Sequence, residues 1–188
     1  MTDTRLDVLA ISGSLRKGSF NTALLRAAQE EAPADVAIEI YDFSDLPLYN
    51  GDVEAAGFPA SAQRFKDRIL KAAAILFAVP EYNYSFPGVL KNAIDWASRP
   101  YGKSAWTSKP VSLMSTGGGL GAARAQYQIR QVLASQGMHI LGAPEIFVLN
   151  AATKFDANLR LTDDVARGLI KQQLVALAAW TRRLAASA

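Results

Sequence analysis

The sequence has no cysteine and only one histidine, His139, among its 188 residues. Without cysteine, the chain can form neither a disulfide nor a zinc–thiolate site, and it has no cysteine nucleophile. The chain also lacks the G-x-S-x-G elbow of serine hydrolases. Because a lone histidine more often packs than reacts, we interpret His139 as structural. Hydrolysis by an activated nucleophile is therefore disfavoured, and we expect no metal site.

Long apolar runs and a strong charge of either sign are absent as well. No apolar stretch reaches the length that crosses a bilayer, and the first residues, MTDTRLD, lack the basic start of a secretory signal. The 20 lysines and arginines against 17 acidic residues leave a net charge of +3, too little to indicate nucleic-acid binding. We therefore expect a cytoplasmic protein, with no membrane span and no nucleic-acid partner.

Short apolar segments alternate with longer amphipathic ones along the chain. The pattern predicts strands over residues 5–11, 36–43, 73–80, 109–115 and 138–149, the last broken at 142–144. It predicts helices over 21–31, 59–72, 87–98, 121–137 and 161–186, the last with Thr162 as its N-cap. Buried strands that alternate with helices are typical of a parallel sheet covered on both faces. We therefore expect one α/β domain spanning residues 1–188.

The segment ISGSLRKGSFN, residues 11–21, joins the first predicted strand to the first predicted helix. Its G-x-x-x-x-G-S pattern resembles the phosphate loop of nucleoside triphosphatases, but Ser19 stands where those proteins have lysine. Neutral hydroxyl, amide and backbone N–H groups before a helix suit a phosphate dianion, and Arg16 can add a charged hydrogen bond. The neutral side chains are those of Ser12, Ser14, Ser19 and Asn21. A capped, solvated turn is the alternative, although one cap needs only one such residue.

The segment PEYNYSFPGVLKNAIDW, residues 80–96, follows the third predicted strand and is rich in aromatic side chains. Pro80 and Pro87 stiffen it, and the polar Glu81 and Asn83 alternate with tyrosines. Rings and amide groups at the carboxyl end of a strand suit a flat heteroaromatic ligand. The alternative is an aromatic cluster over the sheet edge, which leaves the two polar residues unexplained.

The segment MSTGGGLGAAR, residues 114–124, follows the fourth predicted strand. Gly117, Gly119 and Ala122 match the G-x-G-x-x-A motif of dinucleotide-binding proteins. That motif belongs after the first strand, however, and requires an acidic residue about twenty positions later, which this chain lacks. We interpret the glycines as allowing close backbone approach to a ligand ring, with a flexible turn as the alternative.

One loop suited to a single phosphate and two loops suited to a flat ring predict a mononucleotide ligand, and FMN has both parts. The motifs GSLRKGSFN and PEYNYSFPGVLKNAIDW and the glycine-rich loop resemble the NADPH-dependent FMN reductase family, most closely its bacterial quinone and chromate reductase branch. The resemblance covers roughly residues 5–180. It implies a flavodoxin-like three-layer sandwich whose five-stranded parallel sheet has the order 2-1-3-4-5.

The resemblance also implies a chemistry and an assembly. FMN binds non-covalently, NAD(P)H is the co-substrate, and hydride passes through FMN to quinones, flavins, azo compounds or oxidised metals such as chromate. No side chain acts as a catalytic acid or base, because the cofactor carries the hydride. The protein is then expected to be a homodimer or homotetramer.

Individual residues follow from the matching motifs and from their expected places in the fold. The residues expected to bind FMN are Ser14, Leu15, Arg16, Ser19, Phe20, Asn21, Pro80, Glu81, Tyr82, Asn83, Ser115, Thr116, Gly117 and Gly118. Those expected to contact substrate are Tyr82, Tyr84 and Arg99. Those expected at a subunit interface are Tyr84, Arg124, Tyr127 and Glu145.

Three alternatives stay open: a flavodoxin-type one-electron carrier, a flavin-binding sensor without turnover, and an NAD-binding Rossmann dehydrogenase. The misplaced glycine motif counts against the dehydrogenase. A carrier uses negative charge near the ring to disfavour the two-electron-reduced anion. Here the net charge is +3 and the ring loops contain one acid, Glu81, which favours a reductase.

Overall fold

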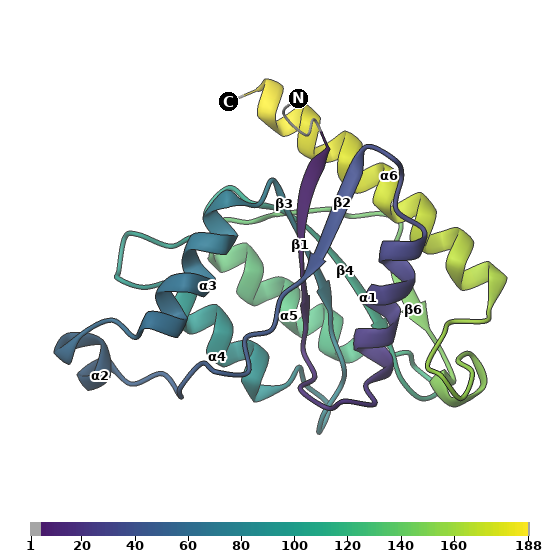
Figure 1. Cartoon of the computed structure of the whole chain (residues 1–188), viewed down its shortest axis with the longest axis horizontal. Helices are drawn as coiled ribbons and strands as arrows, with labels where there is room; N and C mark the ends of the chain where they lie inside the picture. The colour runs from purple at the N-terminus through teal and green to yellow at the C-terminus, as the bar shows by residue number, and fades with distance from the viewer. Residues whose placement is uncertain (1–4, 188) are drawn as a thin grey trace.

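The computed structural model describes residues 5–187, and its centre is a sheet of six parallel strands (Figure 1). The strands are β1 (Leu6–Ser12), β2 (Val36–Ile40), β3 (Ala74–Ala78), β4 (Pro110–Thr116), β5 (His139–Ile140) and β6 (Ile146–Val148). Their order is β2-β1-β3-β4-β5, and β6 also pairs with β4. The predicted flavodoxin-like order is therefore confirmed.

The last predicted strand is present as two short ones. The parallel partners of β4 are His139 opposite Pro110 and Ile146 opposite Met114. Between them the chain leaves the sheet around the cis peptide bond that joins Ala143 to Pro144. The predicted break at residues 142–144 is confirmed, and it accounts for six strands in place of five.

Helices cover both faces of the sheet, as expected. They are α1 (Phe20–Glu30), α2 (Gly51–Ala56), α3 (Ala60–Lys71), α4 (Gly88–Ala97), α5 (Ala123–Ser135), α6 (Asp164–Ala186) and the 3₁₀ turn η1 (Ala151–Thr153). In β1 the side chains alternate between two apolar clusters, as the period of a strand requires. Val8 and Ala10 pack with α1 and α6, whereas Leu9 and Ile11 pack with α3, α4 and α5. The result is a three-layer sandwich.

The short helix α2 was not predicted from the sequence. Asn50 caps it by accepting a hydrogen bond from the backbone N–H of Asp52 at 2.8 Å. No α2 residue is buried, so the segment has no apolar stripe from which a helix could be recognised. In Figure 1, α2 lies at one end of the molecule, away from the sheet.

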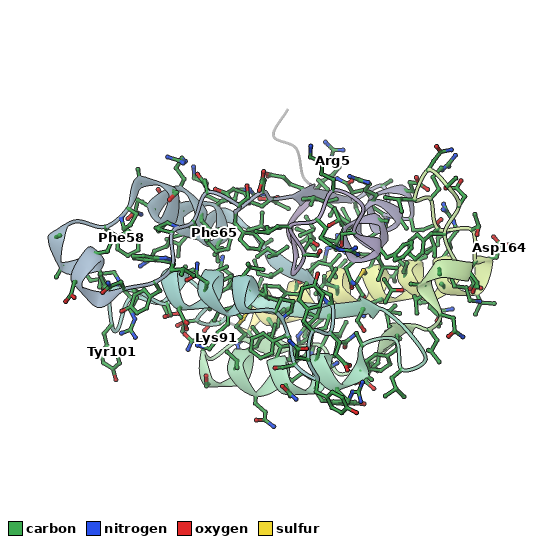
Figure 2. The ribbon with its side chains drawn as sticks, turned by 90° about the horizontal axis from the view of Figure 1, so that it is seen from below. Arg5, Phe58, Phe65, Lys91, Tyr101 and Asp164 are labelled. Atoms are coloured by element: carbon green, nitrogen blue, oxygen red, sulfur yellow. The ribbon has the colours of Figure 1, made fainter. Side chains whose placement is uncertain are left out.

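The predicted N-cap of the last helix was wrong by one residue. Asp163 caps α6, because its Oδ1 accepts a hydrogen bond from the N–H of Ala166 at 2.8 Å. The hydroxyl of Thr162 donates instead to the carbonyl of Lys154 at 3.2 Å. Both residue types are good caps, so sequence alone does not choose between them. Figure 2 shows Asp164, the first residue of α6, at the end of the molecule opposite Phe58 and Tyr101.

The strand order decides where the loops meet. β1, β3 and β4 are neighbours in the sheet and run in the same direction. The loops that follow their carboxyl ends therefore lie at one edge. These are the same three loops whose composition suggested a ligand.

Candidate functional site

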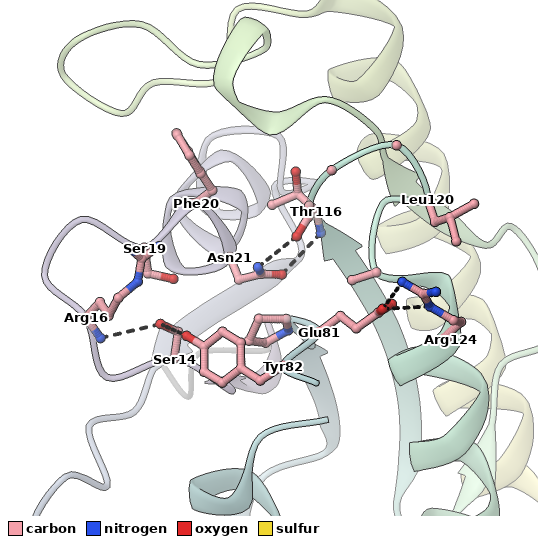
Figure 3. A pocket seen from close by; sticks show the side chains of 15 residues that line it. Ser14, Arg16, Ser19, Phe20, Asn21, Glu81, Tyr82, Thr116, Leu120 and Arg124 are labelled. Atoms are coloured by element: carbon pink, nitrogen blue, oxygen red, sulfur yellow. Dashed lines mark hydrogen bonds and ion pairs between the residues drawn. The ribbon is translucent and has the colours of Figure 1, made fainter. Parts of the chain in front are cut away.

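A cleft of about 350 Å³ lies at the carboxyl edge of the sheet, between the loops that follow β1, β3 and β4 (Figure 3). Its volume falls within the range of about 300–1,000 Å³ that is usual for small-molecule sites. It is lined by Ser14, Arg16, Ser19, Phe20, Asn21, Pro80, Glu81, Tyr82, Thr116, Gly117, Gly118, Gly119, Leu120, Ala122 and Arg124. The three loops thus form one site.

One end of the cleft is the N-terminus of α1. The Oγ of Ser19 accepts a hydrogen bond from the N–H of Thr22 at 3.2 Å and so caps the helix. The hydroxyl hydrogen of Ser19 remains able to donate. The N–H groups of Phe20 and Asn21, in the first turn, have no acceptor within the helix. Because α1 has no acidic residue in its first turn and Arg16 lines the same end, this end of the cleft favours an anion.

Two polar side chains of this loop form hydrogen bonds with other parts of the chain. The Oγ of Ser12 lies 2.8 Å from the Oγ1 of Thr22, and Ser12 does not line the cleft. The amide of Asn21 donates to the carbonyl of Thr116 at 3.0 Å and accepts from its N–H at 3.2 Å (Figure 3). Asn21 therefore fastens α1 to the end of β4 and holds two walls of the cleft together, so only its backbone N–H is left for an anion.

A tight hairpin sets the direction of the aromatic side chains after β3. Tyr82 and Ser85 pair as antiparallel residues through hydrogen bonds of 2.8 and 3.0 Å. Asn83 and Tyr84 between them have φ of 50° and 68°, the signature of a type I′ turn. Tyr82 lines the cleft and its Oη lies 3.2 Å from the Oγ of Ser14, whereas Asn83 and Tyr84 do not line it.

Gly13 lies where the loop after β1 closely approaches the loop after β3. A Cβ at this position would lie 2.7 Å from the Cδ of Pro80, which is closer than two carbon atoms can pack. A side chain here would force the loop after β1 away from the loop after β3. Glycine therefore lets two walls of the cleft meet.

The other end of the cleft carries an ion pair. Arg124 of α5 pairs with Glu81, with its Nε donating to Oε1 at 2.6 Å (Figure 3). The guanidinium of Arg124 lies over the ring of Tyr84, 3.6 Å from the centroid. This hydrogen bond to Glu81 raises the pKa of Arg124. The second carboxylate oxygen, Oε2, is buried and has no hydrogen-bond partner among the described residues. A buried acceptor of this kind favours a ligand that brings an N–H group.

The glycine-rich loop after β4 is held from below by Ser115. Its hydroxyl donates to the carbonyl of Gly121 at 2.5 Å and accepts from Gln126 at 2.9 Å. Ser115 is fully buried and does not line the cleft, whereas Thr116, Gly117 and Gly118 do. The side chain of Ser115 thus shapes the loop rather than facing a ligand.

Most of the residues expected to bind FMN line this one cleft. The exceptions are Leu15, Asn83 and Ser115. Gly119, Leu120, Ala122 and Arg124 line it without having been expected to bind FMN, and Arg124 had been assigned to a subunit interface. The glycine motif could have indicated Ala122, which is its third position. Ala122 is the N-cap of α5 and has a left-handed conformation with φ of 65°.

The structure does not bring Arg99 to the cleft. Its guanidinium lies 5.3 Å from the centroid of the Tyr49 ring, and Arg99 follows the last turn of α4, at the opposite end of that helix from the loop after β3. A helix of ten residues is about 15 Å long, which separates Arg99 from the loop after β3. Arg99 does not line the cleft, and its contact with substrate stays a prediction.

The four residues expected at a subunit interface form two contacting pairs. Tyr84 lies under the guanidinium of Arg124, and the Oη of Tyr127 donates to Glu145 at 3.1 Å. Tyr84 and Tyr127 are 68% and 53% exposed. The pairs lie on the α5 side of the cleft, and their role between subunits stays a prediction.

Within residues 5–187 there is no cluster of three or more metal-ligating side chains. Across the same range, no helix is long and apolar enough to cross a membrane. The cytoplasmic location stays a prediction.

Comparison with known proteins gives a consistent family. Residues 6–153 match the model of the NADPH-dependent FMN reductase family. The chain is 52% identical over 180 residues to an NAD(P)H-dependent FMN reductase of Pseudomonas aeruginosa, covering 95% of this chain and 97% of that protein. It is 48% identical over 184 residues to an NADPH:quinone oxidoreductase of Arabidopsis thaliana, covering 94% and 92%.

A solved structure agrees with the sequence relatives. The flavoenzyme NAD(P)H:acceptor oxidoreductase FerB of Paracoccus denitrificans superposes with a TM-score of 0.86 at 37% identity, covering 94% of this chain and 97% of that one.

Proposed function

Because the chain belongs to the NADPH-dependent FMN reductase family, we propose that it binds FMN in the cleft and uses NAD(P)H to reduce quinones and free flavins. Relatives named as FMN and quinone reductases support this assignment. Azo compounds and chromate are further candidate acceptors within the same proposal.

The single observation that carries the proposal is the donor set at the start of α1. Ser14, Ser19, Arg16 and the N–H groups of Phe20 and Asn21 converge on one end of the cleft. Their chemistry fits a terminal phosphate, because neutral donors, one cation and a helix N-terminus act together on one anion. The proposed phosphate site is therefore this end.

The ring end has matching groups. Pro80 and Tyr82 would border a flat ring, and the loop of Gly117 and Gly118 would present backbone N–H groups to its polar edge. The buried Oε2 of Glu81 would accept a hydrogen bond from a ring N–H. When bound, FMN supplies the two-electron redox chemistry.

The ion pair of Glu81 with Arg124 favours a reductase over a one-electron carrier. In the part of the chain that the structure describes, Glu81 is the only acidic residue that lines the cleft, and Arg124 neutralises it. Negative charge that would oppose a reduced anionic ring is therefore compensated by a cation. The N–H groups of the glycine-rich loop add further stabilisation for charge that develops there.

Removing phosphate contacts tests the assignment. Replacing Arg16 and Ser19 by alanine should lower the affinity for FMN by about tenfold or more for each lost contact to the phosphate. Riboflavin, which lacks the phosphate, should bind the variants almost as it binds the wild type. Titrations followed by flavin fluorescence measure both affinities. Equal losses for the two ligands would show that this loop does not bind phosphate.

Turnover separates an enzyme from a carrier or sensor. Under anaerobic conditions, NADPH or NADH should bleach the flavin absorbance of the FMN-loaded protein directly. Addition of a quinone should restore the colour through many cycles. A protein that binds FMN but whose colour neither nucleotide changes would be a carrier or a sensor.

The same proposal includes assembly into a homodimer or homotetramer through Tyr84, Arg124, Tyr127 and Glu145. Its support is the exposure of the two tyrosines beside paired charges. Sedimentation at micromolar concentration should show an oligomer, and replacing both tyrosines by alanine should weaken it. A monomeric wild type would remove this part of the proposal.

A further inference from the structure

A second groove, also of about 350 Å³, lies on the other side of the phosphate-binding loop. It is bounded by the loop after β1, by α1 and by residues 40–44 after β2. Ser14 and Arg16 line both this groove and the cleft. We call it the basic groove, because its wall carries Arg16, Lys17 and Arg26.

The three cations of the basic groove make no ion pair with any acid of residues 5–187. Several other arginines are paired, and Arg68, for example, reaches both Asp7 and Glu39, although Arg99 and Arg183 make no ion pair within residues 5–187. The fold thus leaves positive charge uncompensated at this place.

Among residues 5–187, one acid lines the basic groove. It is Asp42, whose Oδ1 accepts a hydrogen bond from the N–H of Ser44 at 2.9 Å and holds a local turn. With Arg16 assigned to the FMN phosphate, Lys17 and Arg26 still stand against one committed carboxylate, so the field in the groove is positive, and a concave wall concentrates such a field. The groove therefore suits an anion of more than one charge.

Apolar surface lies beside the charges. Leu15, 48% exposed, and the partly buried ring of Tyr41 both line the groove. An exposed leucine next to an aromatic ring offers a flat base a surface to pack on. The combination of apolar walls with cations matches a phosphorylated nucleoside better than a free inorganic ion.

We propose that the basic groove binds the adenosine 2′-phosphate of NADPH, and that Lys17 and Arg26 make the enzyme prefer NADPH to NADH. The inference rests on the proposed function, since it requires NAD(P)H as the electron donor. The groove adjoins the cleft through Ser14 and Arg16, so a dinucleotide crossing this loop can reach both. The 2′-phosphate is the one anionic group by which the two nucleotides differ.

The first experiment compares the two nucleotides. In the FMN-loaded full chain, the double substitution Lys17→Gln with Arg26→Gln should lower kcat/KM for NADPH by about 100-fold, about tenfold for each charged contact. The value for NADH should change by less than about twofold. Lys171→Gln, which removes an exposed cation of α6, is the matched control and should change neither. The FMN content of all variants should equal that of the wild type.

A binding measurement gives an answer without turnover. Calorimetric titration of the FMN-loaded wild type should show adenosine 2′,5′-bisphosphate binding at least about tenfold more tightly than AMP. The double variant should lose this difference, and Arg26→Lys should retain most of it. Inorganic phosphate at the same concentration should not compete.

Three results would overturn the inference: equal use of NADPH and NADH by the wild type, equal losses for both nucleotides in the double variant, or equal affinity for the bisphosphate and AMP. Failure of the proposed function looks different. The FMN-loaded protein would then oxidise neither nucleotide, while the bisphosphate titration would still decide whether the groove recognises a 2′-phosphate.

Discussion

Helices α1 and α6 begin in the same way but have opposite electrostatic surroundings. Each is capped by a side-chain oxygen that accepts a hydrogen bond from a first-turn N–H, Ser19 for α1 and Asp163 for α6. At α6 the cap is a carboxylate, Asp164 follows it, and Lys154 pairs with Asp163. At α1 the cap is neutral and no acid follows.

The difference shows that the positive N-terminal end of a helix can serve two purposes. The positive end of α6 is compensated by the chain's own acids, and the result is a fixed helix start. The positive end of α1 meets hydroxyl groups and the cation Arg16 at a cleft, so an anionic ligand has to supply the negative charge. The following predictions exchange or remove these features, from the largest expected effect to the smallest.

The largest effect is expected from Ser19→Asp, which gives α1 the kind of cap that α6 has. Aspartate caps as well as serine, so the free energy of unfolding without ligand should stay the same or rise. FMN affinity should fall by about 100-fold or more, because a carboxylate would face the phosphate and one hydroxyl donor is lost. Fluorescence titration measures the affinity and urea unfolding measures the stability.

Riboflavin is the control ligand for this exchange. Its affinity should change little, since it presents no phosphate to the new carboxylate. If Ser19→Asp left FMN binding unchanged, the start of α1 would not be the phosphate site.

A smaller effect is expected at the other helix. Asp163→Ala removes the cap of α6 and should lower the free energy of unfolding by about 1 kcal/mol, within the usual range of about 0.5–2 kcal/mol. FMN affinity should be unchanged, because Asp163 does not line the cleft. Urea unfolding of the apoprotein measures the loss. A loss of FMN affinity alone would contradict the separation of the two helix starts.

The pH dependence of the free energy of unfolding tests the contribution of the charge on Asp163. The hydrogen bond from Lys154 lowers the pKa of Asp163 below its ordinary value of about 3.8. The ion pair therefore stabilises the fold above that ordinary pKa, and its contribution is lost as the pH falls through it towards the folded-state value. Asp163→Asn keeps a good cap but no charge. It should cost about 0.5 kcal/mol at pH 7, and the difference from the wild type should shrink as the pH falls below about 3.8, as measured by urea unfolding at each pH.

The sequence predicted the layers well because burial leaves a periodic signal. Alternation in β1 and the apolar runs of β3 and β4 specified a parallel sheet with two covered faces. The three loops that line the cleft were also identified, since glycine, serine and aromatic residues gather at strand ends. Composition does not predict the direction in which a side chain points. Asn21 and Ser115 are polar enough to bind a ligand, yet both are used to join backbone segments.

Other misses have different physical causes. Helix α2 buries none of its residues, so no pattern announces it. Arg99 does not line the cleft, because α4, about 15 Å long, separates it from the loop before that helix; its contact with substrate stays a prediction. The basic groove could not be predicted from the sequence, because Lys17 and Arg26 come together with residues 40–44 only through the pairing of β1 with β2.

The smallest effect is expected from Thr162→Ala, which tests the corrected start of α6. Thr162 resembles a cap in sequence, and its loss would cost about 1 kcal/mol if it capped the helix. In the structure the cap is Asp163, and Thr162 is an exposed residue whose hydroxyl bonds to the carbonyl of Lys154. Because its backbone N–H still donates to that same carbonyl at 2.9 Å, the substitution should change the free energy of unfolding by less than about 0.5 kcal/mol. Urea unfolding beside Asp163→Ala decides between the two residues: a larger loss from Thr162→Ala than from Asp163→Ala would return the cap to Thr162.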